Sequence, residues 1–243
     1  MNEAAAIIRL CYPPGIPDAE WRWRSDWFRD AVLPRLFDQE DAELDVWVWV
    51  HPRHRAEIAA MDARLHTFDV AQTQPFRRHP ISGMGYPWSA VRGLPRYPVQ
   101  VLLGSDDLVC PHFLRIALNE LARLPQPRAL VHFQPFKYDV ENGKVYDCGI
   151  SVPHTGEYRY HNTMTSMFLA LRQPVDDGRY SWVWARGHTK LYQLADQVQL
   201  VPEGHALLSV HRWNDSTKIT RADKPLPAVD WLGSVRRATA RAA

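Results

Sequence analysis

The chain has 243 residues, 46% of them hydrophobic, and a formal net charge of +2. This hydrophobic content supports a large buried core and excludes a mainly disordered protein, and the small net charge gives no reason to expect a nucleic-acid partner. The three cysteines lack the paired spacing of a disulfide scaffold or a zinc site. No apolar run is long enough for a transmembrane helix and no signal peptide opens the chain. The sequence therefore predicts a cytoplasmic protein.

Strands and helices alternate in the first part of the chain. Strands are predicted at Ala4–Leu10, Leu44–Val50 and Leu65–Val70, with helices at Trp21–Phe37 and Arg53–Arg64 between them. Tryptophans and valines alternate in the second strand, so both of its faces should be covered. A proline inside the first helix is expected to kink or end it. This β-α-β-α-β order is typical of a doubly wound α/β sheet.

A further buried strand over 97–103 ends in the sequence Gly104-Ser105-Asp106-Asp107, and a helix is predicted directly after it, over 111–124. Ligands bind beyond the carboxyl ends of strands in an open α/β sheet. Adjacent carboxylates repel each other unless a cation or a proton relieves them, and small neighbours leave room for an anionic ligand. The pattern indicates a divalent metal that bridges a carboxylate to a phosphate. The alternative is a helix N-terminus, with Ser105 or Asp106 as its cap and Asp107 favoured by the helix dipole.

The second part of the chain has a different pattern. A strand over 128–136 is followed by Glu141-Asn142-Gly143-Lys144, a strong signal for a β-hairpin. Further strands are predicted at Val145–Ile150, Tyr180–Ala185 and Ala206–Val210, the last two followed by His188 and His211. The tail from Arg221 is expected to fray or to cover the surface. A mixed sheet with an antiparallel hairpin is therefore expected in this half.

Several short stretches together resemble a known family. They are Arg9, Trp21, Arg24, Leu33-Pro34-Arg35-Leu36 with Gln39, Trp47-Val48-Trp49-Val50, Ser105-Asp106-Asp107, and His211 with Asn214. In this order they resemble the GT-A fold of nucleotide-sugar-dependent glycosyltransferases, and more closely a bacterial rhamnosyltransferase family. The resemblance implies one domain over 1–243, with a nucleotide-sugar-binding half at 1–125, an acceptor half at 126–220 and a tail at 221–243.

The resemblance also implies a reaction and a set of site residues. The reaction would move a sugar, rhamnose if the family analogy holds, from a nucleoside-diphosphate donor to a saccharide or another hydroxyl acceptor, assisted by Mg²⁺ or Mn²⁺. Asp106 would hold the ion, and His211 or His188 would complete its coordination. The donor would contact Arg9, Asp69, Ser105, Asp107 and Asn214. Spacing does not choose the general base among Asp139, Asp147 and Asp177, or their neighbours Glu141 and Asp176.

Two departures from the family pattern leave an alternative open. Gly104 replaces the first Asp of the Asp-Ser-Asp-Asp tip, so metal affinity is expected to be weak, and His51-Pro52 stands where an acidic residue usually follows the second strand. The chain would then be a non-catalytic nucleotide- or carbohydrate-binding protein on a degenerate GT-A scaffold. A nucleotidyltransferase is disfavoured because Pro13-Pro14-Gly15 offers one glycine where a phosphate loop needs several. The Gly- and Pro-rich stretch over 72–92 is expected to order over a bound ligand.

Overall fold

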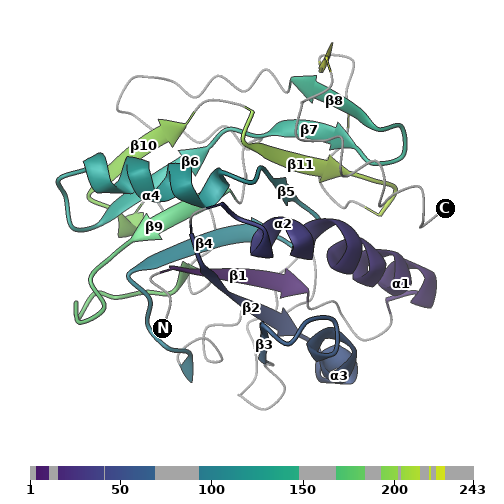
Figure 1. Cartoon of the computed structure of the whole chain (residues 1–243), viewed down its shortest axis with the longest axis horizontal. Coiled ribbons are helices and arrows are strands. Elements are labelled where there is room, and N and C mark those ends of the chain that lie inside the picture. Colours follow the sequence, from purple (N-terminus) through teal and green to yellow (C-terminus); the bar gives the residue numbers. More distant parts are fainter. Residues whose placement is uncertain are drawn as a thin grey trace.

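The computed structural model describes residues 4–10, 16–40, 42–68, 93–147, 168–183, 193–201, 204–213, 219 and 223–227. Within these ranges the chain forms two sheets with helices packed beside them (Figure 1). No helix in the described ranges is long and apolar enough to cross a membrane. The expected mixed α/β architecture is therefore confirmed for this part of the chain.

The larger sheet has seven strands in the order β10-β6-β9-β4-β1-β2-β3. These strands are β1 (Ala4–Leu10), β2 (Leu44–Val50), β3 (Leu65–Phe68), β4 (Val99–Gly104), β6 (Ala129–Phe133), β9 (Leu169–Arg172) and β10 (Gln197–Val201). β1 pairs in parallel with both β2 and β4, whereas β9 runs antiparallel between β4 and β6. The chain steps from β1 to β2 and β3 and then returns to the other side of β1. Such a reversal of strand order creates a crevice beyond the ends of β1 and β4.

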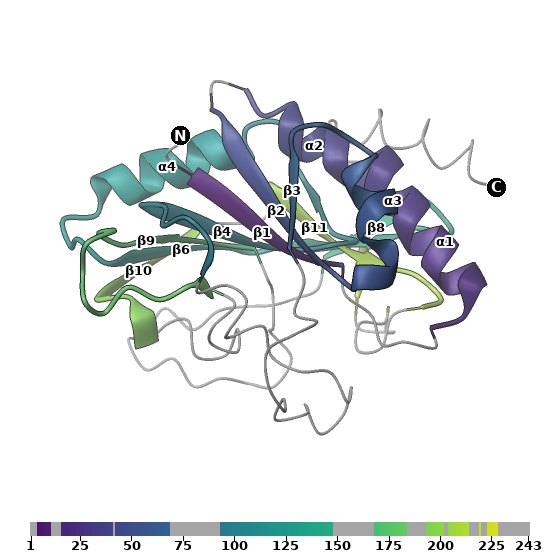
Figure 2. The ribbon, with the colours of Figure 1, turned by 90° about the horizontal axis from the view of Figure 1, so that it is seen from below.

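Both faces of this sheet are buried, as the alternating second strand predicts. Val46, Val48 and Val50 of β2 join the core cluster that includes the helices, and Trp49 joins the cluster on the opposite face. The helices α1 (Asp18–Trp27), α2 (Leu33–Phe37), α3 (Arg55–Ala59) and α4 (Phe113–Arg123) lie on the same side of the sheet (Figure 2). The expected doubly wound arrangement is thus wrong for the described helices. Loop side chains such as Trp182 cover the other face instead.

The smaller sheet has five strands in the order β12-β8-β7-β11-β5. They are β5 (Leu108–Val109), β7 (Phe136–Asp139), β8 (Lys144–Asp147), β11 (Ala206–Val210) and β12 (Lys224–Leu226). β7 and β8 form the expected antiparallel hairpin, and Gly143 has φ of +65° in its turn, a conformation that glycine adopts without strain. β5 precedes residue 125 in the chain and joins this sheet, whereas β9 follows it and joins the larger sheet. Each sheet therefore contains strands from both sides of residue 125.

At the proline, where a kink or an end of the helix was expected, the helical segment changes form without ending. Between α1 and α2 the chain forms a π-helical turn, η1 (Phe28–Val32), and Pro34 lies in the first turn of α2. Proline lacks a backbone N–H and is tolerated in a first turn, where that donor has no intrahelical partner. The second expected helix is shorter than predicted, with a 3₁₀ turn η2 (Pro52–His54) followed by α3. Beyond Ala59 the chain turns, and Asp62 accepts a hydrogen bond from the Arg64 N–H at 2.9 Å.

Other expected elements differ in place or in kind. The predicted strand Tyr180–Ala185 is wrong over its described residues: Tyr180 lies at a turn, its hydroxyl accepts from the Tyr97 N–H at 3.0 Å, and the Val183 N–H donates to the Gln100 side chain at 2.9 Å. The strands β5, β10 and β12 were not predicted. β5 has two residues, too few for a periodicity to show. β12, in the tail expected to fray, pairs with β8.

Candidate active site

Asp106 and Asp107 lie at the junction of the two sheets. β4 ends at Gly104, and β5 of the smaller sheet begins at Leu108. The helix α4 begins only at Phe113, and its N-cap residue makes no capping hydrogen bond with its side chain. The helix-cap alternative for this stretch is therefore wrong. The unpredicted strand β5 separates the carboxylates from the helix and ties them to β11.

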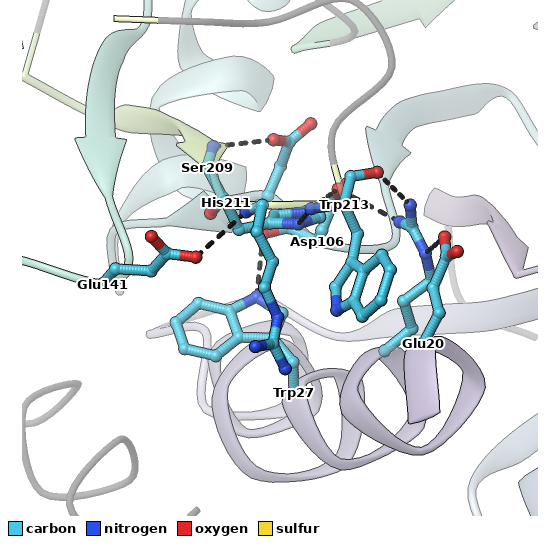
Figure 3. Close-up of polar contacts among 10 residues, drawn as sticks. Glu20, Trp27, Asp106, Glu141, Ser209, His211 and Trp213 are labelled. Carbon is cyan, nitrogen blue, oxygen red and sulfur yellow. Dashed lines mark hydrogen bonds and ion pairs between the residues drawn. The ribbon is translucent and has the colours of Figure 1, made fainter. Parts of the chain in front are cut away.

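Three side chains from distant parts of the chain contact Asp106. Its Oδ2 lies 2.9 Å from Nε2 of His211 and 3.7 Å from Nη1 of Arg24. Its backbone carbonyl accepts a 2.9 Å hydrogen bond from Nε1 of Trp27. Asp106, His211 and Trp27 are seen together in Figure 3. The carboxylate remains 18% exposed, so it faces a partly open position at the sheet junction.

His211 follows directly after β11 and is the histidine that the structure brings to Asp106. Its side chain is 1% exposed, and the ring of Trp23 lies 4.1 Å from its ring. Nδ1 accepts a hydrogen bond from the Trp213 N–H at 3.2 Å. In the neutral ring, an accepting Nδ1 leaves the proton on Nε2, where it donates to Asp106. The predicted pairing of His211 with Asp106 is therefore present in the geometry.

One face of α1 forms a wall of the site. Glu20, Trp23, Arg24 and Trp27 have the spacing of a single helical stripe. Glu20 accepts from Nε of Arg24 at 2.8 Å, and Nη2 of Arg24 donates to the Trp213 carbonyl at 2.7 Å. Sequence reasoning noted Arg24 through the family resemblance and gave Trp27 no role in the site. The available signal was this stripe, in which a buried arginine and two tryptophans share one face.

Asp107 has surroundings unlike those of Asp106. Its side chain is buried, Oδ1 accepts a 3.1 Å hydrogen bond from the Ser209 N–H of β11, and Oδ2 has no hydrogen-bond partner among the residues that the structure describes. Burial raises the pKa of Asp107 well above its usual value, and the charge of Asp106 adds to the effect. The raised pKa means that Asp107 takes up a proton more readily, and such a proton would relieve the repulsion between the adjacent carboxylates.

The other predicted donor contacts divide into two groups. Arg9 pairs in register with Gly104 at the ends of β1 and β4, and its guanidinium lies 5.5 Å from the Trp49 ring centre. Ser105 is buried at the same edge. Both therefore lie at the crevice where the strand order reverses. Asp69, Asn214 and the second metal candidate His188 fall outside the described residues.

The predicted general-base candidates are not gathered at Asp106. Asp139 accepts hydrogen bonds from the Glu141 and Asn142 N–H groups, both at 3.1 Å, and so shapes the β7–β8 turn. Asp177 contacts Arg128, which precedes β6, at the sheet edge opposite the β4 tip. Its pKa is lowered, first by the Arg179 N–H and then by Arg128.

Asp147 ends β8, which runs antiparallel to β7 and so finishes away from the His211 end of β11. Asp139 pairs in register with Val210 of β11, and Glu141 contacts the β11 exit through its side chain, where its Oε1 accepts from the Arg212 N–H at 3.1 Å (Figure 3). Glu141 thus connects the hairpin turn to the segment that carries His211. The general base stays without a residue assigned to it.

The Asp106–His211 pair fits a divalent ion that also takes oxygen ligands from its substrate. Among the residues that the structure describes, no group of three or more His, Cys, Asp or Glu side chains is arranged to hold a metal. Mg²⁺ is commonly held by one or two carboxylates together with substrate phosphates and water. For His211 to ligate through Nε2, the ring proton must reside on Nδ1 instead.

The chain is similar in sequence to one protein family and in fold to solved structures. The sequence matches the family described as "Putative rhamnosyl transferase" over residues 17–223. The fold is similar to that of S. aureus TarS 1-349 in complex with UDP-GlcNAc, with a TM-score of 0.55, 13% identity, and coverage of 90% of this chain and 62% of the TarS chain. The UDP complex of the same TarS fragment gives a TM-score of 0.51 at 13% identity, with 86% and 60% covered. No curated protein matches the sequence significantly.

The likeness in fold and the family match support different conclusions. At 13% identity the likeness to TarS shows the fold alone, which is of the GT-A type, so the expected fold class is confirmed. The chain spans about three fifths of the TarS fragment that it matches. The family match, in contrast, covers well over half of the chain and includes α1, both carboxylates and His211. The chain belongs to the family described as "Putative rhamnosyl transferase".

Proposed function

We propose that the chain is a glycosyltransferase that moves a sugar from a nucleoside-diphosphate donor to a hydroxyl group of an acceptor. The observation that carries the proposal is the contact between Asp106 and His211, 2.9 Å apart, beyond the crevice where β1 and β4 end. Family membership and the fold shared with TarS, whose structures hold UDP-GlcNAc and UDP, support the donor class.

In the proposed site, Asp106 and His211 would hold Mg²⁺ or Mn²⁺ against the donor's diphosphate. The bound ion would supply positive charge where negative charge develops on the leaving diphosphate. Arg9 and Ser105, at the ends of β1 and β4, would bind the donor, because small and basic groups at strand ends accommodate phosphate. Trp27 holds the Asp106 carbonyl, so the carboxylate keeps its direction.

Asp107 is proposed to have a structural role and not to act as a second metal ligand. Its Oδ1 takes the Ser209 N–H, so the carboxyl group holds β11 at the point that delivers His211. A neutral carboxylic acid performs this task as well as a carboxylate does, since its carbonyl oxygen still accepts. The acceptor class, a saccharide or another hydroxyl compound, remains as the family resemblance implies, and rhamnose as the donor sugar follows from the family description.

Donor turnover tests the proposal against a protein that only binds. The purified chain is incubated with Mn²⁺ and UDP-N-acetylglucosamine, UDP-glucose or dTDP-rhamnose, with and without simple saccharide acceptors, and release of the nucleoside diphosphate is measured. We expect release from at least one donor and its loss in Asp106→Asn. Donor binding without release under every condition would favour the non-catalytic alternative.

A further inference from the structure

Arg24 places a positive charge inside the candidate metal site. Its side chain is 6% exposed, and Nη1 lies 3.7 Å from Oδ2 of Asp106, the same oxygen that His211 contacts. Glu20 at 2.8 Å and the Trp213 carbonyl at 2.7 Å hold the guanidinium in this position. The charge is therefore fixed beside the carboxylate that would bind the cation.

A divalent ion at Asp106 and the guanidinium of Arg24 would repel each other. The repulsion between two like charges at about 4 Å is large wherever water screens them incompletely. Glu20 offsets part of the Arg24 charge, but it contacts Nε, on the side away from Asp106. Gly104, at the end of β4, adds no carboxylate. In the described site, the partly exposed carboxylate of Asp106 thus faces an arginine whose charge it shares with Glu20.

We infer that Arg24 makes metal binding at Asp106 depend on the donor's diphosphate. Without a nucleotide, Arg24 neutralises Asp106 and disfavours a free ion. When a diphosphate arrives, the guanidinium pairs with phosphate oxygens, for which its geometry is well suited. The Arg24 charge is then balanced by the diphosphate instead of by Asp106, and the Asp106 carboxylate can bind the ion. The inference rests on the proposed function, because it needs a diphosphate and an ion at this site.

The experiment measures the Mn²⁺ dissociation constant of the full chain by electron paramagnetic resonance of free Mn²⁺. Without nucleotide, Arg24→Met should bind Mn²⁺ about tenfold or more tightly than the wild type, because a nearby repulsive charge is gone while the aliphatic packing is kept. Arg24→Lys keeps the charge and should stay near the wild type. The matched control is Arg22→Met on the exposed side of the same helix, which should leave the constant unchanged.

Two further measurements supplement the comparison of Arg24→Met with the wild type. Glu20→Gln removes the partner of Arg24 and should weaken Mn²⁺ binding, the opposite sign to Arg24→Met on the same wall of the site. Saturating UDP should tighten Mn²⁺ binding by the wild type, and this enhancement should shrink in Arg24→Met. Circular dichroism of each variant establishes that it is folded before its titration is compared.

The outcomes separate this inference from the proposed function. Weaker or equal Mn²⁺ binding by folded Arg24→Met without nucleotide would overturn the inference and make Arg24 a positioning residue. If UDP enhances Mn²⁺ binding equally in the wild type and Arg24→Met, the inference fails while metal use stands. If the wild type binds no Mn²⁺ even with saturating UDP, the metal part of the proposed function fails too.

Discussion

The adjacent residues Asp106 and Asp107 belong to regions of opposite character. Asp106 faces the polar stripe of α1 and the exit of β11, remains partly exposed, and contacts His211 and Arg24. Asp107 faces the interior of the smaller sheet, where it is buried against the Ser209 N–H. The difference shows that a carboxylate pair in a sequence need not be a pair in chemistry. One side chain can be held ready for a ligand while its neighbour holds a strand in place.

The largest expected effect is a difference in the rate of sugar transfer between variants of Asp106 and of Asp107. Asp106→Asn should lower the rate of sugar transfer by about a hundredfold or more, the scale for losing a group that stabilises a developing anion. Asp107→Asn should change the rate by roughly threefold at most, because an amide oxygen still accepts from Ser209 and Asp107 is not one of the proposed ion ligands. Steady-state rates with a common donor provide the measurement. Similar losses in both variants would erase the proposed division.

Acid stability should depend on groups other than Asp107. The raised pKa of Asp107 contributes stability at low pH that is lost as the pH rises, so this carboxyl does not cause acid unfolding. His132 on β6 has the opposite sign, because burial lowers its pKa to about 4. The unfolded chain binds that proton at about pH 6.5, so stability should fall between pH 6.5 and 4, by an amount on the order of 3 kcal/mol.

Urea unfolding of metal-free protein at several pH values tests this assignment. The variant His132→Leu removes the buried titrating group and keeps an apolar side chain of similar size. Its loss of stability between pH 6.5 and 4 should be clearly smaller than that of the wild type. An unchanged loss would move the acid sensitivity to another part of the molecule.

Removal of the Asp107 side chain should lower the free energy of unfolding more than its replacement by asparagine does. Asp107→Ala leaves the buried Ser209 N–H without its acceptor, at a cost of about 1–3 kcal/mol in the free energy of unfolding. Asp107→Asn is the matched control, because it keeps an acceptor of the same size. Urea titration of both variants gives the comparison. Equal stabilities would show that the Ser209 contact does not hold β11.

A smaller effect is expected from the tryptophan that holds Asp106. Trp27→Phe removes the Nε1–H donor to the Asp106 carbonyl and keeps an aromatic ring in the core. The loss of one such hydrogen bond should lower stability by about 1 kcal/mol. The rate of transfer should fall by a larger factor than in Trp21→Phe, whose indole donates to Glu57 on another side of α1. Equal rates in the two variants would detach Trp27 from the site.

Features that depend on local pattern could be predicted from the sequence. The parallel strands β1, β2 and β4 follow from buried runs, and the β7–β8 hairpin follows from Asn142-Gly143. The family resemblance implies that Asp106 and either His211 or His188 bind one ion, and the structure brings His211 into contact with Asp106. The strand ends that carry the candidate site could thus be predicted from the sequence.

The missing parts depend on tertiary contacts. β5 is two residues long and is a strand only because β11 pairs with it, so the sequence pointed instead to a helix directly after Asp107. The roles of Arg24 and Trp27 depend on how α1 packs against that tip, which periodicity within α1 does not reveal. Likewise, the buried state of Asp107 becomes visible only with the second sheet in place.

The proposed site depends above all on Asp106, which would join a divalent cation to the donor's diphosphate. The most direct measurement is the melting temperature of the wild type and Asp106→Asn with UDP, each with and without Mn²⁺, since a ligand that binds only the folded state raises it. We expect a rise with UDP that Mn²⁺ enlarges in the wild type, and a rise in Asp106→Asn that Mn²⁺ leaves unchanged. A rise that Mn²⁺ enlarges equally in both proteins would contradict the claim.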